Sequence, residues 1–165
     1  MHLGYNCVYL PNKYNYQKVD GVAHFKDYFR ISSNDMTNDI HLGLSDGYIG
    51  HEHDRWEIVI GGRKASEHVI RDRMQGPLLA RVSSSQAKFN QLRNDFILQC
   101  TDGKIAVYES DSGRKGILIM EFNDQRIKKS KLNTLAVSGG WGSSGDIHFR
   151  GYPDNFSELK GKSHF

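Results

Sequence analysis

The sequence predicts an all-β protein, an antiparallel β-sandwich of the jelly-roll type, built as a single domain over residues 1–165. Short segments in which apolar and polar residues alternate recur along the chain, and this period of two is typical of half-buried strands. The 17 glycines against three prolines indicate many tight turns. A chain of 165 residues is within the usual size of one domain.

Twelve segments are expected to form strands, because they alternate in this way or are continuously apolar. In chain order they are Cys7–Leu10, Val22–Phe25, Tyr28–Ser33, Ile40–Leu44, Trp56–Ile60, Val69–Arg71, Leu78–Val82, Phe96–Cys100, Ile105–Tyr108, Ile117–Phe122, Leu135–Ser138 and Ile147–Arg150. Turn residues separate them at short intervals, as in a sandwich or barrel.

The clearest local prediction is a hairpin between Phe96–Cys100 and Lys104–Glu109. Asp102 and Gly103 lie between the two segments and suit the positive-φ positions of a tight turn. Helical patterns are rare. Ser85–Asn94 fits either a short helix or a loop.

Composition excludes some classes of partner. The net charge is only +3, and the basic residues are spread out, so nucleic acid is not expected to bind. No segment approaches the roughly 20 apolar residues that cross a bilayer, so we expect no membrane insertion. The first residues lack the basic and apolar regions of a signal peptide, which we expect to be absent or removed.

Two cysteines, Cys7 and Cys100, are too few for a disulfide framework. They fit either one bridge or two free buried thiols, and this choice leaves the redox compartment open. Asn155 begins a glycosylation acceptor pattern that matters only in a secreted protein.

Motifs of catalysis, cofactor binding and metal binding are weak. Gly140–Gly145 matches G-x-G-x-x-G, but a strand-like segment follows it, so we interpret it as a turn and expect no cofactor. His51 and His53 would share one face of a strand, but a metal site usually needs a third ligand, and we expect a polar loop. No nucleophile elbow is present, and we assign no catalytic residue and no metal.

Three segments together resemble a known family. They are Tyr28–Ile31 with Asn38–Ser45, Trp56–Gly62 running on to Ser66 and Ile70-Arg71, and Leu135–Gly142 with Gly145 and Ile147–Phe149. Over about residues 25–149 the chain resembles the domain named after farnesoic acid O-methyltransferase, which is common in invertebrate proteins.

The resemblance implies a β-sandwich binding module like those beside lectin-like and adhesion regions. It does not imply methyl transfer, because an S-adenosylmethionine-dependent methyltransferase normally needs an α/β sheet with an acidic, Gly-rich loop. The chain departs from the family after Gly61-Gly62, where Arg63 and Lys64 replace the usual aromatic. A site at that turn would be more cationic than in the family.

Sugar sites combine an aromatic face with planar polar groups on the loops of a rigid scaffold. Trp141 lies in a Gly-rich turn that leaves it uncovered, and Asp146 and His148 follow on the polar face of the next strand. The alternative is that Trp141 closes the end of the sandwich and Asp146 holds the turn.

Further candidates lie on the middle strands. Asp39 and His41 alternate with apolar residues and should face away from the core. Glu57 either opposes the core or is buried in an ion pair with Arg71, and such a pair is more often structural than functional. Arg63 could contact an acidic or sulfated sugar, or lie in a solvated loop tip.

The sequence therefore predicts a lectin that binds glycans or glycoproteins without chemistry on the ligand. Single sites of this kind are weak, so we expect a homo-oligomer. We also expect an extracellular or secreted protein. The alternatives are a protein-interaction module and, behind it, a methyltransferase.

Overall fold

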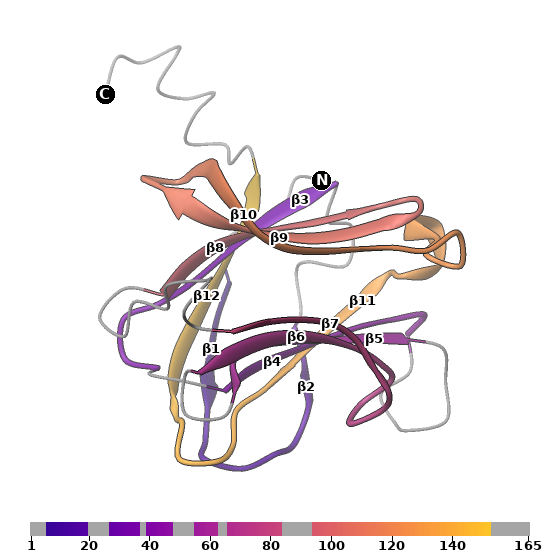
Figure 1. Ribbon diagram of the computed structural model, residues 1–165. Coiled ribbons are helices and arrows are strands. Elements are labelled where there is room, and N and C mark those ends of the chain that lie inside the picture. Colours follow the sequence, from indigo (N-terminus) through magenta and orange to yellow (C-terminus); the bar gives the residue numbers. More distant parts are fainter. Residues whose placement is uncertain are drawn as a thin grey trace.

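The computed structural model describes residues 6–19, 27–36, 39–47, 55–62, 66–83 and 94–152. Two antiparallel sheets of six strands each pack face to face (Figure 1). The predicted all-β sandwich is therefore confirmed.

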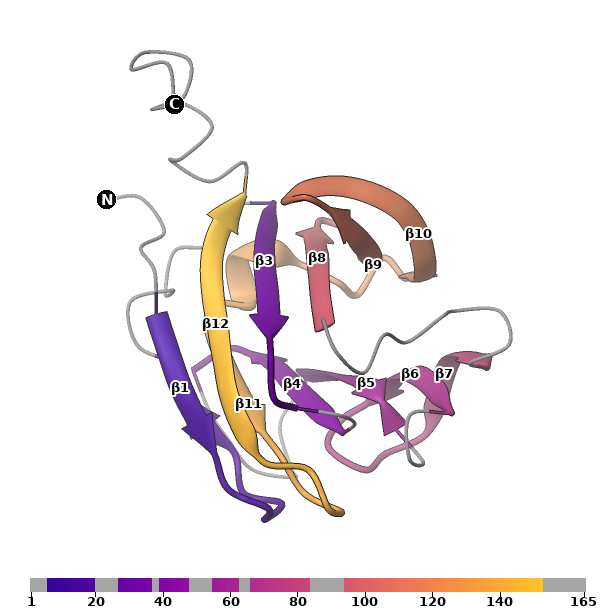
Figure 2. The same cartoon turned by 90° about the vertical axis from the view of Figure 1, so that its left-hand side faces the viewer.

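The first sheet, here called sheet A, has the strand order β1-β12-β3-β8-β9-β10, which Figure 2 shows from left to right. Its strands are β1 (Asn6–Leu10), β3 (Tyr28–Ser33), β8 (Asn94–Thr101), β9 (Lys104–Asp111), β10 (Arg114–Asn123) and β12 (Gly145–Tyr152).

The second sheet, sheet B, has the order β2-β11-β4-β5-β6-β7. Its strands are β2 (Gln17–Lys18), β4 (Ile40–Ser45), β5 (Arg55–Gly61), β6 (Glu67–Asp72), β7 (Leu78–Ser83) and β11 (Thr134–Ser138), and a 3₁₀ turn, η1 (Lys129–Lys131), precedes β11.

Eleven of the twelve expected segments lie within these strands, and the twelfth, Val22–Phe25, is outside the described residues. The predicted hairpin is β8–β9, where Gly103 has a φ of 84°. Strand β2 was not predicted, because its two polar residues have no alternation and pair only with β11. Of the short helix or loop at Ser85–Asn94, only Asn94 is described, at the start of β8.

The core lies between the sheets and is built by the inward residues of each alternating pattern. Phe29 of β3 and Phe149 of β12 meet Leu42 of β4 and Ile58 of β5 in one cluster of fully buried side chains. Full burial of each such side chain stabilises the fold by about 1.5–3 kcal/mol. The residues between them along each strand face outward, and those of sheet B form the candidate site.

The two cysteines are free, so the disulfide considered from the sequence does not form. Cys7 is exposed on β1 rather than buried. Cys100 is in the core, where burial raises the pKa of its thiol to about 12. In the described part of the chain, no helix is long and apolar enough to span a membrane.

Candidate functional site

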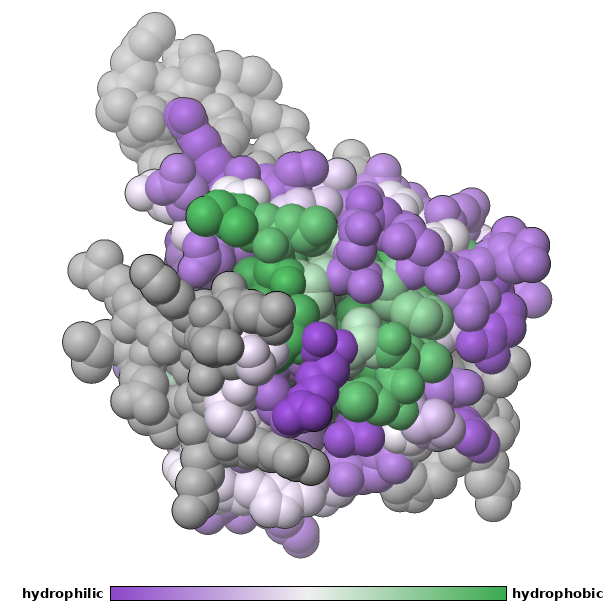
Figure 3. Space-filling view, viewed as in Figure 1, coloured by the Kyte–Doolittle hydropathy of each residue, from purple (hydrophilic) through white to green (hydrophobic). Residues whose placement is uncertain are grey.

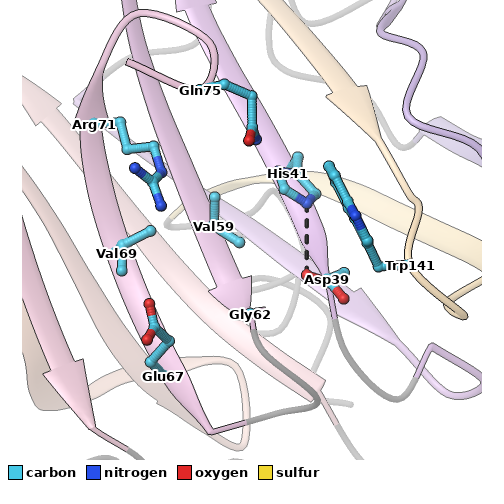
Figure 4. Close-up of a pocket in the computed structure, with 9 residues that line it drawn as sticks. All are labelled: Asp39, His41, Val59, Gly62, Glu67, Val69, Arg71, Gln75 and Trp141. Atoms are coloured by element: carbon cyan, nitrogen blue, oxygen red, sulfur yellow. Dashed lines mark ion pairs between the residues drawn. The ribbon is translucent and has the colours of Figure 1, made fainter. Parts of the chain in front are cut away.

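A cavity of about 550 Å³ lies on the outer face of sheet B, over strands β4, β5 and β6 (Figure 4). Its lining joins apolar, charged and aromatic side chains: Asp39, His41, Val59, Gly62, Glu67, Val69, Arg71, Gln75 and Trp141.

The strand register builds the floor. His41 of β4 is opposite Val59 of β5, and Val59 is opposite Val69 of β6, so the three side chains form a row across the sheet. All three are buried. Because side chains alternate along a strand, this row points away from the core that Leu42, Ile58 and Ile70 fill.

Trp141 forms one side of the cavity and is 56% exposed, although it is large and apolar. It is at the tip of the turn between β11 and β12, and its ring lies 5.2 Å from the ring of His41 and 5.0 Å from that of Tyr14. A residue distant in the sequence holds this turn, since the Gly142 N–H donates to Asn12 Oδ1 at 2.8 Å. Trp141 is thus held in place while much of its indole stays open.

Backbone strain gathers around the cavity. Five described residues other than glycine have a positive φ, and three of them line it: Asp39 (47°), Gln75 (58°) and Trp141 (49°). A non-glycine residue in this conformation costs on the order of 1–3 kcal/mol, and such residues cluster at functional sites. The strain therefore indicates a site that is shaped for more than packing.

Glu57 is fully buried beneath the cavity and is tightly held. Its Oε2 accepts hydrogen bonds from the hydroxyls of Tyr14 (2.7 Å) and Tyr16 (2.5 Å), and its Oε1 accepts one from the Gln75 N–H (2.9 Å). Burial, followed by the charge of Glu57, raises the pKa values of both tyrosines, so both hydroxyls stay protonated donors.

The ion pair with Arg71, one of the two arrangements considered for Glu57, does not form. The two residues are directly opposite each other on β5 and β6. However, the tyrosines occupy the carboxylate, and Arg71 Nη1 donates instead to the carbonyl of Gly76 at 3.1 Å.

His41 is between two carboxylates. Its Nε2 is 3.6 Å from Asp39 Oδ1, and its Nδ1 is 3.4 Å from Glu57 Oε2. Burial alone lowers the pKa of His41, but these two contacts outweigh it and raise the pKa above its usual 6.5. A protonated His41 would offset one of the two negative charges beside it.

Gly43 allows the side chains of Met74 and Tyr16 to lie close to the backbone of sheet B. A Cβ at this position would be 2.6 Å from the Met74 methyl group and 3.2 Å from the Tyr16 ring. Glycine therefore lets Tyr16 reach Glu57 on the neighbouring strand.

The structure brings together four of the predicted site residues. Asp39, His41, Arg71 and Trp141 line the cavity, and Glu57 supports it from below.

Three predicted residues are not part of this cluster. Asp146 and His148 are half-buried on the polar face of β12 in sheet A, as their alternation predicted, but do not line the cavity. The turn after Trp141 carries the chain from one sheet to the other. Arg63 is outside the described residues.

Sequence reasoning missed Tyr14, Tyr16, Glu67, Val69 and Gln75. The spacing of Glu67, Val69 and Arg71, which alternate on one face of β6, was the available signal. Gln75 and the tyrosines come from loops, where alternation predicts nothing.

No group of three or more metal-ligating side chains occurs among the described residues, and His51 and His53 lie outside them. The cavity offers an aromatic face, a guanidinium, carboxylates and an amide around an apolar floor. This set suits non-covalent recognition of a small ligand with an apolar face and polar edges.

Solved structures similar to this chain include two galectins and a CBM40 module. Sheep galectin-11 in complex with glycerol has a TM-score of 0.50 and 14% identity over 84% of this chain and 98% of its own. A Caenorhabditis elegans galectin has a TM-score of 0.49 and 11% identity, covering 87% and 95%. The CBM40 module of a Ruminococcus gnavus sialidase, bound to sialyllactose, has a TM-score of 0.49 and 10% identity, covering 90% of this chain and 92% of its own.

The first of these likenesses shows that the chain shares the sandwich fold of this galectin. No curated protein matches the sequence. The profile of the family described as farnesoic acid O-methyl transferase matches residues 9–152, a wider span than the sequence resemblance suggested. Because this match covers most of the sequence, the chain belongs to the farnesoic acid O-methyl transferase family.

Proposed function

We propose that this chain is a lectin that holds a glycan non-covalently in the cavity on sheet B. The observation that carries the proposal is Trp141, an exposed indole held in a strained turn at the edge of that cavity. Keeping a large aromatic in water costs hydrophobic free energy that burial would recover. A ligand that covers the indole recovers it on binding.

The rest of the cavity supports a sugar as this ligand. One face of a pyranose ring carries C–H groups that stack on an aromatic, and its edges carry hydroxyls. Asp39 and Gln75 supply acceptors and a donor around the Val59–Val69 floor. Asp39 and Gln75 lie in connections beside a rigid sheet, and the hydrogen bond from the Gln75 N–H to Glu57 holds one of them in place, which reduces the entropy lost on binding.

A single shallow site of this kind binds weakly, so we include in the proposal that several copies act together. A homo-oligomer on an extracellular surface would provide this avidity, and sedimentation velocity measures the oligomeric state.

The family's name denotes methyl transfer, which would require S-adenosylmethionine. The described residues form antiparallel sheets rather than the strand–loop–helix units in which such a cofactor normally lies. We therefore place glycan binding ahead of methyl transfer.

A protein-interaction role is the second candidate, because apolar side chains are exposed on the edge strands β7 and β10. Leu78 is 47% exposed, Leu118 42% and Ile117 73%. Figure 3 shows apolar surface on the side of the molecule where these strands lie. Such surface often marks a protein contact.

Trp141→Ala is expected to weaken binding on a glycan array and in titrations by about 30-fold, since a stacked aromatic anchor contributes about 2 kcal/mol. The melting temperature should stay within about 2 °C, because the side chain is mostly exposed and makes few contacts to the core.

Tyr9→Ala is the matched control, since Tyr9 is a similarly exposed aromatic (60%) on strand β1 of sheet A. It should bind like the wild type. A folded protein that binds no glycan would favour the protein-interaction role. A melting temperature raised by S-adenosylmethionine would favour methyl transfer. Equal losses in the two variants would place the site elsewhere.

A further inference from the structure

The carboxylates at the cavity each have a partner of their own. Glu57 accepts hydrogen bonds from two tyrosines and a backbone N–H. Asp39 lies beside His41 at 3.6 Å. Glu67, which is only 5% exposed, pairs with Arg81 of β7 at 3.1 Å.

Arg71 is a cation at the cavity that takes part in none of these pairs. Within the described residues no carboxylate lies within 4.0 Å of its guanidinium, although Glu57 is directly opposite on β5. The adjacent carboxylate, Asp72, is directed to Arg73 and Arg126. Among the residues that the structure describes, the charge of Arg71 is therefore not neutralised by an ion pair.

The donors of Arg71 are also largely unused. A guanidinium has five N–H donors in a rigid fork. In the described part of the chain one hydrogen bond holds it, from Nη1 to the carbonyl of Gly76. Figure 4 shows the guanidinium directed into the cavity beside Val59 and Val69. A half-buried guanidinium over an apolar floor is screened less by water than one on an open surface.

Glu57, directly opposite Arg71, is engaged by its own hydrogen bonds, and the two carboxylates that line the cavity lie farther from Arg71. Glu67 is four residues from Arg71 along β6, roughly 13 Å between Cα atoms at the usual rise of a strand. Asp39 immediately precedes β4, two strands away, and lies beside His41.

We propose that Arg71 receives an anionic group, a carboxylate or a sulfate ester, of a glycan whose sugar ring lies against Trp141. This inference rests on the proposed function and names its ligand class as acidic glycans. The guanidinium fork matches the two oxygens of either group and forms two parallel charge-assisted hydrogen bonds with it. The alternative is that Arg71 serves only to brace the turn after β6. That role uses one of its donors and does not explain the orientation of the others.

The test compares matched glycans by titration: lactose, sialylated lactose and lactose carrying a sulfate ester. The wild type should bind at least one acidic form about tenfold more tightly than lactose, the gain expected of one charge-assisted pair. Whether the carboxylate or the sulfate form binds more tightly identifies the source of the anion.

Arg71→Gln should remove this tenfold preference and leave the affinity for lactose within about twofold. Arg71→Lys keeps the charge without the fork and should retain part of the preference. Arg150→Gln, the same charge change at an exposed position on β12 of sheet A, should behave like the wild type.

Binding of lactose also reports that the Arg71 variants are folded. Equal affinity for neutral and acidic forms, or an equal loss of both in Arg71→Gln, would overturn this inference and leave the proposed function standing. A folded wild type that binds none of the three sugars, and no other glycan on the array, would overturn both.

Discussion

Replacing Glu57 with alanine is expected to lower the free energy of unfolding by about 3–5 kcal/mol, the cost typical of breaking a buried charge cluster. The change leaves the hydroxyls of two half-buried tyrosines and the Gln75 N–H without this acceptor. It also leaves His41 with one carboxylate neighbour instead of two. Urea unfolding of the variant and the wild type measures the difference.

Glu121→Gln is the control for this prediction. Glu121 is partly exposed on β10 and pairs with Lys104 at 2.9 Å. Loss of an exposed pair should cost less than about 1 kcal/mol. A Glu57→Ala variant as stable as Glu121→Gln would contradict the role given to the buried cluster.

The cluster also connects stability to the site. Glu57 holds Tyr14, and the ring of Tyr14 packs against that of Trp141. Loss of Glu57 should therefore weaken glycan binding even under conditions where the variant is folded. The fold and the candidate site depend on the same carboxylate.

The sandwich could be predicted because its strands bury one face and expose the other. Ile147 and Phe149 on β12 are fully buried, whereas Asp146 and His148 between them are half-buried. The alternation of apolar and polar residues along the sequence predicts this difference directly. The same rule placed Asp39 and His41 on the outer face of sheet B.

The partners of those outward residues could not be predicted, because they come from segments distant in the sequence. Tyr14 and Tyr16 reach Glu57 across 43 and 41 residues. Strand pairing alone put Arg71 opposite Glu57, which is correct, and suggested an ion pair, which is wrong. The register of a sheet fixes which residues face each other, but loops decide which groups bond.

Trp141 illustrates a second limit. It is close in sequence to Asp146 and His148, and the three were expected to act together. The turn between Gly140 and Gly145 crosses from sheet B to sheet A, so Trp141 packs over His41 instead. Positive φ at Gly140 and Gly142, on either side of Trp141, makes this turn tight.

Acidification is expected to destabilise the protein by about 3 kcal/mol through Glu57 alone, between about pH 5 and pH 2. Burial raises the pKa of Glu57, but the His41 contact and the hydrogen bonds from Tyr16, Gln75 and Tyr14 lower it from 4.5 to about 2. A carboxylate with a depressed folded-state pKa stabilises the fold above its unfolded pKa. This contribution is lost as the pH falls through the folded pKa.

His41 acts in the opposite direction. Its folded-state pKa is raised above 6.5, so its contribution is complete below that pH and is lost as the pH rises through the folded pKa. Stability should therefore be greatest between about pH 5 and pH 6. Denaturant unfolding is measured for the wild type and Glu57→Gln between about pH 2 and pH 6. The comparison isolates the loss of stability in acid that is due to Glu57, because every other carboxylate titrates in both proteins. The difference between them should shrink towards pH 2, and a constant difference would mean that Glu57 is not the group that titrates.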